Sequence, residues 1–178
     1  KGGSSAAPER DFNFDYNFWS VYKGDPYFSS QEDVFLQLGM PIIESCLRGM
    51  NCSLFAYGQT GSGKTYTMMG SSDSDENMGL IPRICRAILG QLTSKDLNIE
   101  GSIEKLLSAK VFVSFLEIYN EKIFDLLSTT SGVTSRVREH PQNGAYVENL
   151  TKVKADGYQD ILQILNDGKR RRQVASTL

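Results

Sequence analysis

Three stretches of the chain place apolar residues every three to four positions, the period of a helix with one buried face. They lie within residues 29–48, 81–92 and 158–165. Pro41 falls inside the first stretch and predicts a kink or break there, because proline has no N–H to donate and its ring crowds the preceding turn. Pro82 suits the first turn of the second helix.

Other stretches alternate polar and apolar residues or run continuously apolar, which predicts strands. FNFDYNFW, residues 12–19, puts aromatic rings on alternate positions, so we expect an aromatic face within the core. CSLFAY (52–57) predicts a buried strand, and KVFVSFLEI (110–118) predicts a central one, followed by a short apolar packing segment, IFDLL (123–127). Residues 137–153 predict two or three short strands around a Pro/Asn/Gly turn. Strands alternating with helices predict an α/β domain with a largely parallel sheet.

Composition limits the possible partners. The 178 residues are 40% hydrophobic and 22% charged, the balance of one globular domain. Their net charge of −2 gives no reason to expect nucleic acid binding. No apolar run is long enough for membrane insertion, and no signal peptide is visible. The three cysteines include no CxxC pair, which predicts reduced, mostly buried thiols in a cytosolic protein. Residues 1–10 have the composition of a flexible lead-in without an initiator Met, so we expect a fragment.

GQTGSGKT, residues 58–65, matches the phosphate-binding pattern G-x-x-x-x-G-K-[ST]. The match is informative because a predicted strand precedes it and TYTMM, which can open a helix, follows it. The alternative is a glycine-rich surface turn with a solvated lysine. The candidate phosphate-binding residues are Gly58, Gln59, Thr60, Gly61, Ser62, Gly63, Lys64 and Thr65.

Each residue type in this loop has a chemical reason. Glycines reach positive φ and let the backbone approach an anion, so that successive N–H groups form a nest. Lys64 would supply a mobile point charge for the β and γ phosphates. The Thr65 hydroxyl would bind Mg²⁺, which bridges those phosphates.

Five blocks in order along the chain resemble the kinesin motor head. FAYGQTGSGKTYTMMG (55–70) is similar to the kinesin nucleotide-loop signature, and GLIPRI (79–84) to the helix that resumes after its acidic loop. FNFDYNFW, SFLEIYNEKIFDLL (114–127) and VREHPQNGAYVENL (137–150) match three further kinesin segments. The last resembles the hairpin of the vesicle-transport kinesins that often carry a forkhead-associated domain.

This resemblance implies a P-loop NTPase fold and an ATP-driven microtubule motor, a cytoplasmic protein of the microtubule cytoskeleton whose longer chain would contain a coiled coil. It implies ATP and Mg²⁺ as ligands and places the Tyr66 ring against the adenine. Residues 136–154 match a secondary tubulin contact, with Arg138, His140 and Lys152 as its basic candidates. His140 beside Pro141 also fits an ordinary turn.

KRRR (169–172) has three interpretations: a solvated helix end, a binding patch or a nuclear import signal.

Several parts of a kinesin head are not in these 178 residues. They include the first strand with its R-x-R-P adenine contact, the switch motifs N-x-x-S-S-R-S-H and D-L-A-G-S-E, and the main tubulin-binding helices. Residues 11–178 are therefore expected to be a partial motor domain with an incomplete sheet, unpaired apolar strand edges and very slow hydrolysis. Two alternatives remain: a non-catalytic tubulin-binding or regulatory fragment, and another P-loop enzyme such as a nucleotide kinase.

Overall fold

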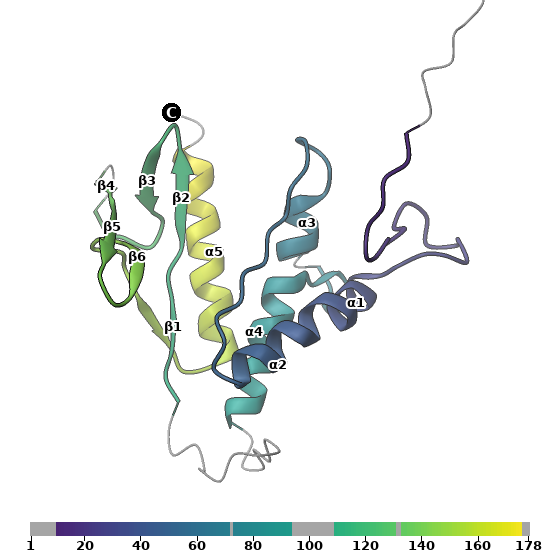
Figure 1. The fold of residues 1–178 in the computed structure, drawn as a ribbon, viewed down its shortest axis with the longest axis horizontal. Helices are drawn as coiled ribbons and strands as arrows, with labels where there is room; N and C mark the ends of the chain where they lie inside the picture. Colours follow the sequence, from purple (N-terminus) through teal and green to yellow (C-terminus); the bar gives the residue numbers. More distant parts are fainter. Residues whose placement is uncertain (1–9, 72, 94–108, 131–132, 176–178) are drawn as a thin grey trace, which may run out of the picture.

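The computed structural model describes residues 10–71, 73–93, 109–130 and 133–175 (Figure 1). The predicted lead-in, residues 1–10, lies almost wholly outside them. The helices are α1 (Gln31–Val34), the π-helix η1 (Phe35–Gly39), α2 (Met40–Leu47), α3 (Lys64–Met69), the 3₁₀ turn η2 (Asp75–Asn77), α4 (Leu80–Thr93) and α5 (Tyr158–Ala175). The strands are β1 (Val111–Val113), β2 (Leu116–Tyr119), β3 (Lys122–Asp125), β4 (Thr134–Ser135), β5 (Val137–His140), β6 (Gly144–Val147) and β7 (Val153–Ala155).

The three predicted helices are confirmed. The first does not break at Pro41, because α1, η1 and α2 follow one another without a gap and only the helix type changes. Ser30 and Asp33 form a capping box that starts α1, with the Ser30 side chain accepting from the Asp33 N–H. One π-helical turn, η1, then leads into α2, and Pro41 lies in the first turn of α2. Prolines and π turns are both known sites of irregularity within helices.

The predicted parallel sheet is wrong for the described residues, because every pair of named strands is antiparallel. The structure holds three small sheets, with orders β1-β7, β2-β3-β4 and β5-β6. The expected central strand 110–118 divides into β1 and β2 because the chain changes partners there. At this break the Ser114 Oγ donates to the Thr151 carbonyl at 2.8 Å. The sequence predicts only apolar packing for residues 123–127, but the first part of this segment belongs to strand β3.

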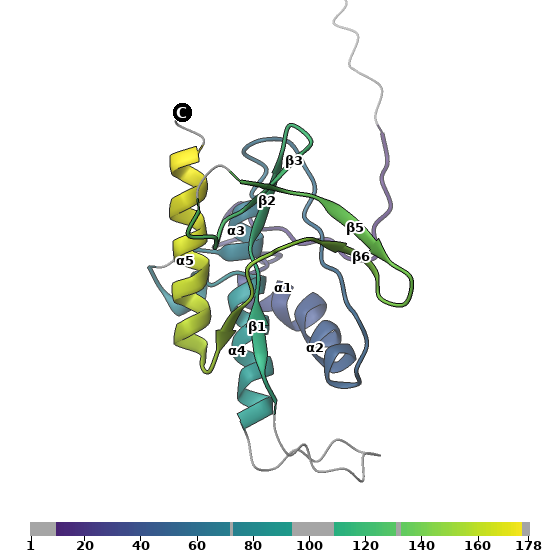
Figure 2. The ribbon, with the colours of Figure 1, turned by 90° about the vertical axis from the view of Figure 1, so that its left-hand side faces the viewer.

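The apolar core lies where α4 and α5 meet the β1-β7 pair (Figure 2). Its buried members are Leu89, Ala155, Ile161 and Ile164. The predicted helical periodicity explains two of the contributors, since Leu89 and Ile161 lie on the apolar faces of α4 and α5. None of the described helices has the length and hydropathy needed to cross a membrane.

Two predicted strands do not form. Residues 12–19 contribute only an isolated bridge between Trp19 and Phe28, and the Phe12 and Phe14 rings are exposed rather than in the core. Residues 52–57 run as an extended, unpaired segment from α2 to the glycine loop (Figure 1). Strand propensity alone does not form a strand, because the backbone groups also need a partner edge.

Candidate functional site

The glycine loop has a backbone conformation that its glycines make possible. Gly58, Gly61 and Gly63 have φ of 152°, 84° and 88°, values that residues with a side chain rarely adopt. A Cβ on Gly58 would also lie 2.5 Å from the Ser62 Oγ. The loop turns through a hydrogen bond from the Ser62 N–H to the Gln59 carbonyl, at 3.2 Å. It ends where Gly63 precedes Lys64, the first residue of α3.

The Lys64 side chain folds back onto the start of this loop. Its ammonium donates to the carbonyls of Gly58 and Gln59, each at 2.7 Å. Among the described residues, no acceptor faces the N–H groups of Gly61, Gly63 or Lys64. The loop therefore offers unused N–H donors beside a lysine whose present partners are neutral, which is the donor set that an anion needs.

The start of α3 is held from two sides. Gln31, whose side chain is buried, donates through Nε2 to the Tyr66 carbonyl at 2.7 Å and joins α1 to α3. The Tyr66 hydroxyl donates to the Asn77 Oδ1 at 3.1 Å, leaving the ring 48% exposed. Thr65 is exposed between them. The sequence reasoning missed both Gln31 and Asn77, and neither belongs to a motif that could have pointed to them.

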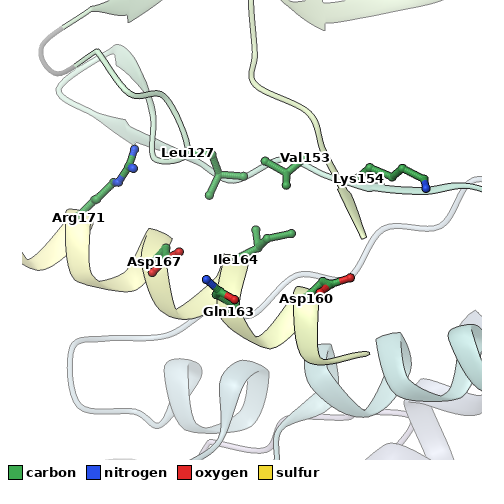
Figure 3. A pocket seen from close by; sticks show the side chains of 8 residues that line it. All are labelled: Leu127, Val153, Lys154, Asp160, Gln163, Ile164, Asp167 and Arg171. Carbon is green, nitrogen blue, oxygen red and sulfur yellow. The ribbon is translucent and has the colours of Figure 1, made fainter. Parts of the chain in front are cut away.

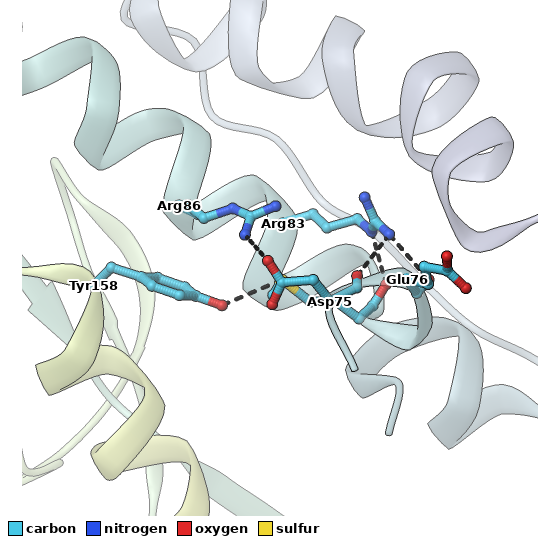
Figure 4. Close-up of polar contacts among 6 residues, drawn as sticks. Asp75, Glu76, Arg83, Arg86 and Tyr158 are labelled. Carbon is cyan, nitrogen blue, oxygen red and sulfur yellow. Dashed lines mark hydrogen bonds and ion pairs between the residues drawn. The ribbon is translucent and has the colours of Figure 1, made fainter. Parts of the chain in front are cut away.

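The acidic loop beyond α3 is ordered by a buried arginine (Figure 4). Arg83 on α4 is 8% exposed and donates to the carbonyls of Met78, Asp75 and Glu76 at 2.8, 3.0 and 3.0 Å. These bonds use the Nε and Nη2 donors of the guanidinium and fix the 3₁₀ turn η2. The described residues 71 and 73–76 are exposed, but the order of this loop depends on α4.

The same loop also reaches α5. Arg86 pairs with the Asp75 carboxylate at 3.0 Å and lies over the Tyr158 ring, 6.0 Å from its centroid. The Tyr158 hydroxyl donates to the Met78 sulfur at 3.2 Å. Residues 70–79 thus connect the helix after the glycine loop with the core helices.

The three basic candidates for a tubulin contact lie on or beside the β5–β6 hairpin, apart from the glycine loop (Figure 1). Arg138 pairs with Glu148 at 2.8 Å, and this hydrogen bond raises the pKa of Arg138. The His140 Nδ1 accepts the N–H groups of Gln142 and Asn143, both at 3.2 Å, so this side chain stabilises the turn. Lys152 is exposed just before β7. Arg138 and Lys152 are both exposed, and of these two only Arg138 has an ion-pair partner among the described residues.

The basic cluster 169–172 bonds within the chain. Arg172 pairs with Glu117 at 3.0 Å, Arg170 with Asp167 at 2.6 Å, and Arg171 donates to the Ser128 carbonyl. These partners favour the interpretation of KRRR as a helix end over that of a binding patch.

A groove of about 310 Å³ separates α5 from the strand side of the core (Figure 3). Its charged lining residues are occupied locally: the Asp160 carboxylate accepts the Asp156 and Gly157 N–H groups and caps α5, and Lys154 pairs with Asp156. The groove therefore offers no free set of groups for a ligand. Among the described residues, no group of three or more His, Cys, Asp or Glu side chains is placed to hold a metal ion.

The chain matches the family model of the kinesin motor domain over residues 2–178. It is 42% identical to the kinesin-like protein unc-104 of Caenorhabditis elegans, over 93% of this chain and 10% of that protein. It is 42% identical to the kinesin-like protein KIF16B of Mus musculus, over 99% of this chain and 13% of that one. The chain therefore spans only a small part of the length of these relatives.

Solved structures give the same result. A KIF14 dimer with AMP-PNP in complex with a microtubule superposes with a TM-score of 0.77 at 38% identity, covering 90% of this chain and 43% of that one. A structure described as a fast kinesin superposes with a TM-score of 0.74 at 37% identity, covering 84% and 40%. The resemblance of the sequence blocks is confirmed: the chain belongs to the kinesin motor domain family.

Proposed function

We propose that this chain is the nucleotide-binding part of a microtubule motor ATPase head, and that its glycine loop binds ATP. The observation that carries the proposal is the loop itself: three positive-φ glycines, unused N–H donors and Lys64 in one turn. Solved relatives described with AMP-PNP or ADP on a microtubule support the same ligand class and the same partner.

The proposed binding mode follows from the present contacts. Lys64 exchanges its bonds to two neutral carbonyls for bonds to the β and γ phosphates, in which the donor and the acceptor carry opposite charges. The two carbonyls belong to exposed residues and can bond water instead. Tyr66 contacts the adenine through its exposed ring face. Gly58, Gln59, Thr60, Gly61, Ser62 and Gly63 supply the backbone of the cradle.

Thr65 is the residue proposed to hold Mg²⁺. Its hydroxyl is exposed at the first turn of α3, next to Lys64, which fits a ligand to a cation that shares the phosphates. Mg²⁺ held by Thr65 would neutralise part of the charge on the phosphates.

The microtubule contact is proposed for Arg138 and Lys152, with His140 holding the hairpin turn that presents them. Basic side chains on a hairpin suit the acidic surface of tubulin, and such contacts mainly speed association. We place the motor in the cytoplasm, on the microtubule cytoskeleton.

The test is nucleotide binding and ATP turnover by the purified 178-residue chain, with and without microtubules. Lys64→Ala is the loss variant, and Lys23→Ala, at an exposed lysine outside the loop, is the matched control. We expect weak ATP binding that Lys64→Ala abolishes and Lys23→Ala leaves unchanged. We also expect very slow hydrolysis, because neither switch motif is among these residues.

Each other outcome has a definite meaning. ATP binding that persists in Lys64→Ala would overturn the assignment of the loop. Turnover that rises with microtubules and vanishes in the Lys64 variant would show that the switch motifs are dispensable. Microtubule binding without any nucleotide binding would favour the alternative of a non-catalytic tubulin-binding fragment.

A further inference from the structure

Two cysteines, Cys46 on α2 and Cys52 at the start of the segment that leads into the glycine loop, lie near each other. Helix α2 ends at Leu47, where the Gly49 N–H donates to the Cys46 carbonyl at 2.9 Å and the Met50 N–H to the Ser45 carbonyl at 3.0 Å. These bonds turn the chain back along the helix that it has just left. Cys52 follows two residues later and therefore returns to the last turns of α2.

The contacts of Cys52 fix its place against α2. Its Sγ lies 3.8 Å from the Ile42 carbonyl and 3.9 Å from the Met50 carbonyl. Ile42 and Cys46 are four residues apart in the helix, so they share one face. Burial raises the pKa of the Cys46 thiol, and the nearby Cys52 thiol raises that pKa further. The two thiols are neighbours.

We propose that Cys46 and Cys52 form a dithiol modification site that a peroxide oxidises to an intramolecular disulfide. Both cysteines are free, Cys52 is exposed and Cys46 is half-buried. Residues 50–57 belong to none of the strand pairs among the described residues, so the backbone can adjust to the short distance that a disulfide requires. This inference does not depend on the proposed nucleotide site.

The chemistry proceeds in two steps. The exposed Cys52 sulfur attacks hydrogen peroxide, which breaks the O–O bond and gives Cys52 sulfenic acid and one water. The Cys46 sulfur then attacks the Cys52 sulfur, the S–O bond breaks, and the released hydroxide leaves as a second water with the Cys46 proton. Two thiols are oxidised and one peroxide is reduced. The product tethers the chain six residues before Gly58 to α2.

The test is peptide mapping of the whole chain after dilute hydrogen peroxide, with free thiols then alkylated under denaturing conditions. Trypsin cuts after Lys23, Arg48 and Lys64, so the two cysteines fall in separate peptides, 24–48 and 49–64. We expect these peptides to become cross-linked, with the loss of two hydrogens and of two alkylation sites, and to separate again with dithiothreitol.

Cys85 is the matched control, because burial also raises the pKa of its thiol but it packs against the core from α4. Cys85→Ser should leave the cross-link intact. Cys52→Ser should abolish it and leave Cys46 unoxidised, and Cys46→Ser should leave Cys52 to proceed to sulfinic acid or to link two chains. A cross-link to peptide 84–86, or wild-type Cys52 oxidised without loss of the Cys46 thiol, would overturn the proposal. So would no reaction at either residue.

Discussion

Residues 52–57 and 110–118 have similar apolar, strand-favouring sequences but opposite fates. The second segment becomes β1 and β2, and Val111 and Val113 pack against the core. The first remains extended and unpaired, with Phe55 87% and Tyr57 102% exposed. The difference lies in the partners: β1 has β7 beside it and two helices over it, whereas none of the described strands reaches residues 52–57.

The comparison extends to the two regions that contain these segments. The core region, with α4, α5, β1 and β7, is held by apolar burial. The glycine-loop region is held by polar contacts, chiefly those of Gln31, Lys64 and Tyr66. Apolar burial resists unfolding, while hydrogen bonds to exposed groups leave a region easier to open. The proposed binding of nucleotide needs that freedom because the donors of the loop must remain available.

The largest contrast is expected from one truncation in each region. Ile161→Ala removes a side chain that is 2% exposed and should lower the free energy of unfolding by about 2–5 kcal/mol, because it leaves a cavity. Phe55→Ala should change it by less than about 0.5 kcal/mol. Urea denaturation followed by circular dichroism measures both. Similar losses for the two variants would contradict the division into two regions.

Two mid-helix glycines give the next contrast. A Cβ at Gly168 on α5 would lie 2.1 Å from the Phe115 ring, so Gly168→Ala should destabilise the core by about 1–3 kcal/mol. A Cβ at Gly90 on α4 would have no neighbouring atom within 4 Å, so Gly90→Ala should stabilise the chain by up to about 1 kcal/mol through helix propensity. Thermal unfolding of both variants tests the packing of α5. Shifts of the melting temperature with the same sign in both variants would contradict this packing.

Arg83 and Arg86 test the link between the regions. Arg83→Met leaves the three carbonyls of the acidic loop without their buried donor, so we expect a loss of about 1–3 kcal/mol and faster hydrogen exchange over residues 75–78. Arg86→Met removes an exposed ion pair and the guanidinium over the Tyr158 ring, and should cost about 1 kcal/mol or less. Equal exchange rates in the two variants would show that the loop does not depend on Arg83.

Asn77 tests whether the polar contacts of the glycine-loop region position Tyr66. If Tyr66 contacts the adenine, Asn77→Ala should weaken ATP binding about three- to tenfold, the worth of one hydrogen bond. Binding of inorganic tripolyphosphate should not change, because it has no base. Asn143→Ala, at an exposed hairpin asparagine, is the control. Equal losses for both ligands would point to a general loosening of the loop.

The smallest effect concerns pH. Burial raises the pKa of Asp125, but hydrogen bonds from Thr151, Leu127 and Ser128 outweigh it and lower the pKa below its ordinary value. Because the folded pKa is the lower one, the stabilisation is present above the ordinary carboxyl pKa and is lost as the pH falls through the folded one. Asp125→Asn should reduce the loss of unfolding free energy below about pH 4. The reduction should be less than roughly 1 kcal/mol, because solvent screens the carboxylate. Urea midpoints at several pH values measure this slope, and an unchanged slope would contradict the assignment.

The helices were predictable because their signals are local. The 3.6-residue period of α4 and α5 and the place of Pro41 in the first turn of α2 depend on residues within a few positions of one another. The glycine loop was predictable for the same reason, since a phosphate cradle is built from consecutive backbone groups. The positive φ of Gly58, Gly61 and Gly63 agrees with the pattern that the sequence displays.

The strands were predicted less well because pairing is not local. Residues 12–19 and 52–57 carry strand patterns but have no partner strand, and residues 110–118 divide between two partners. The periodicity of a segment does not show which strand it will pair with, or whether the pair will be parallel or antiparallel. The antiparallel pairing therefore could not be derived from the sequence. Only the tertiary structure brought Gln31 and Asn77 to Tyr66. These contacts depend on where separate elements meet in space, while the helices and the glycine loop depend on neighbours in the chain.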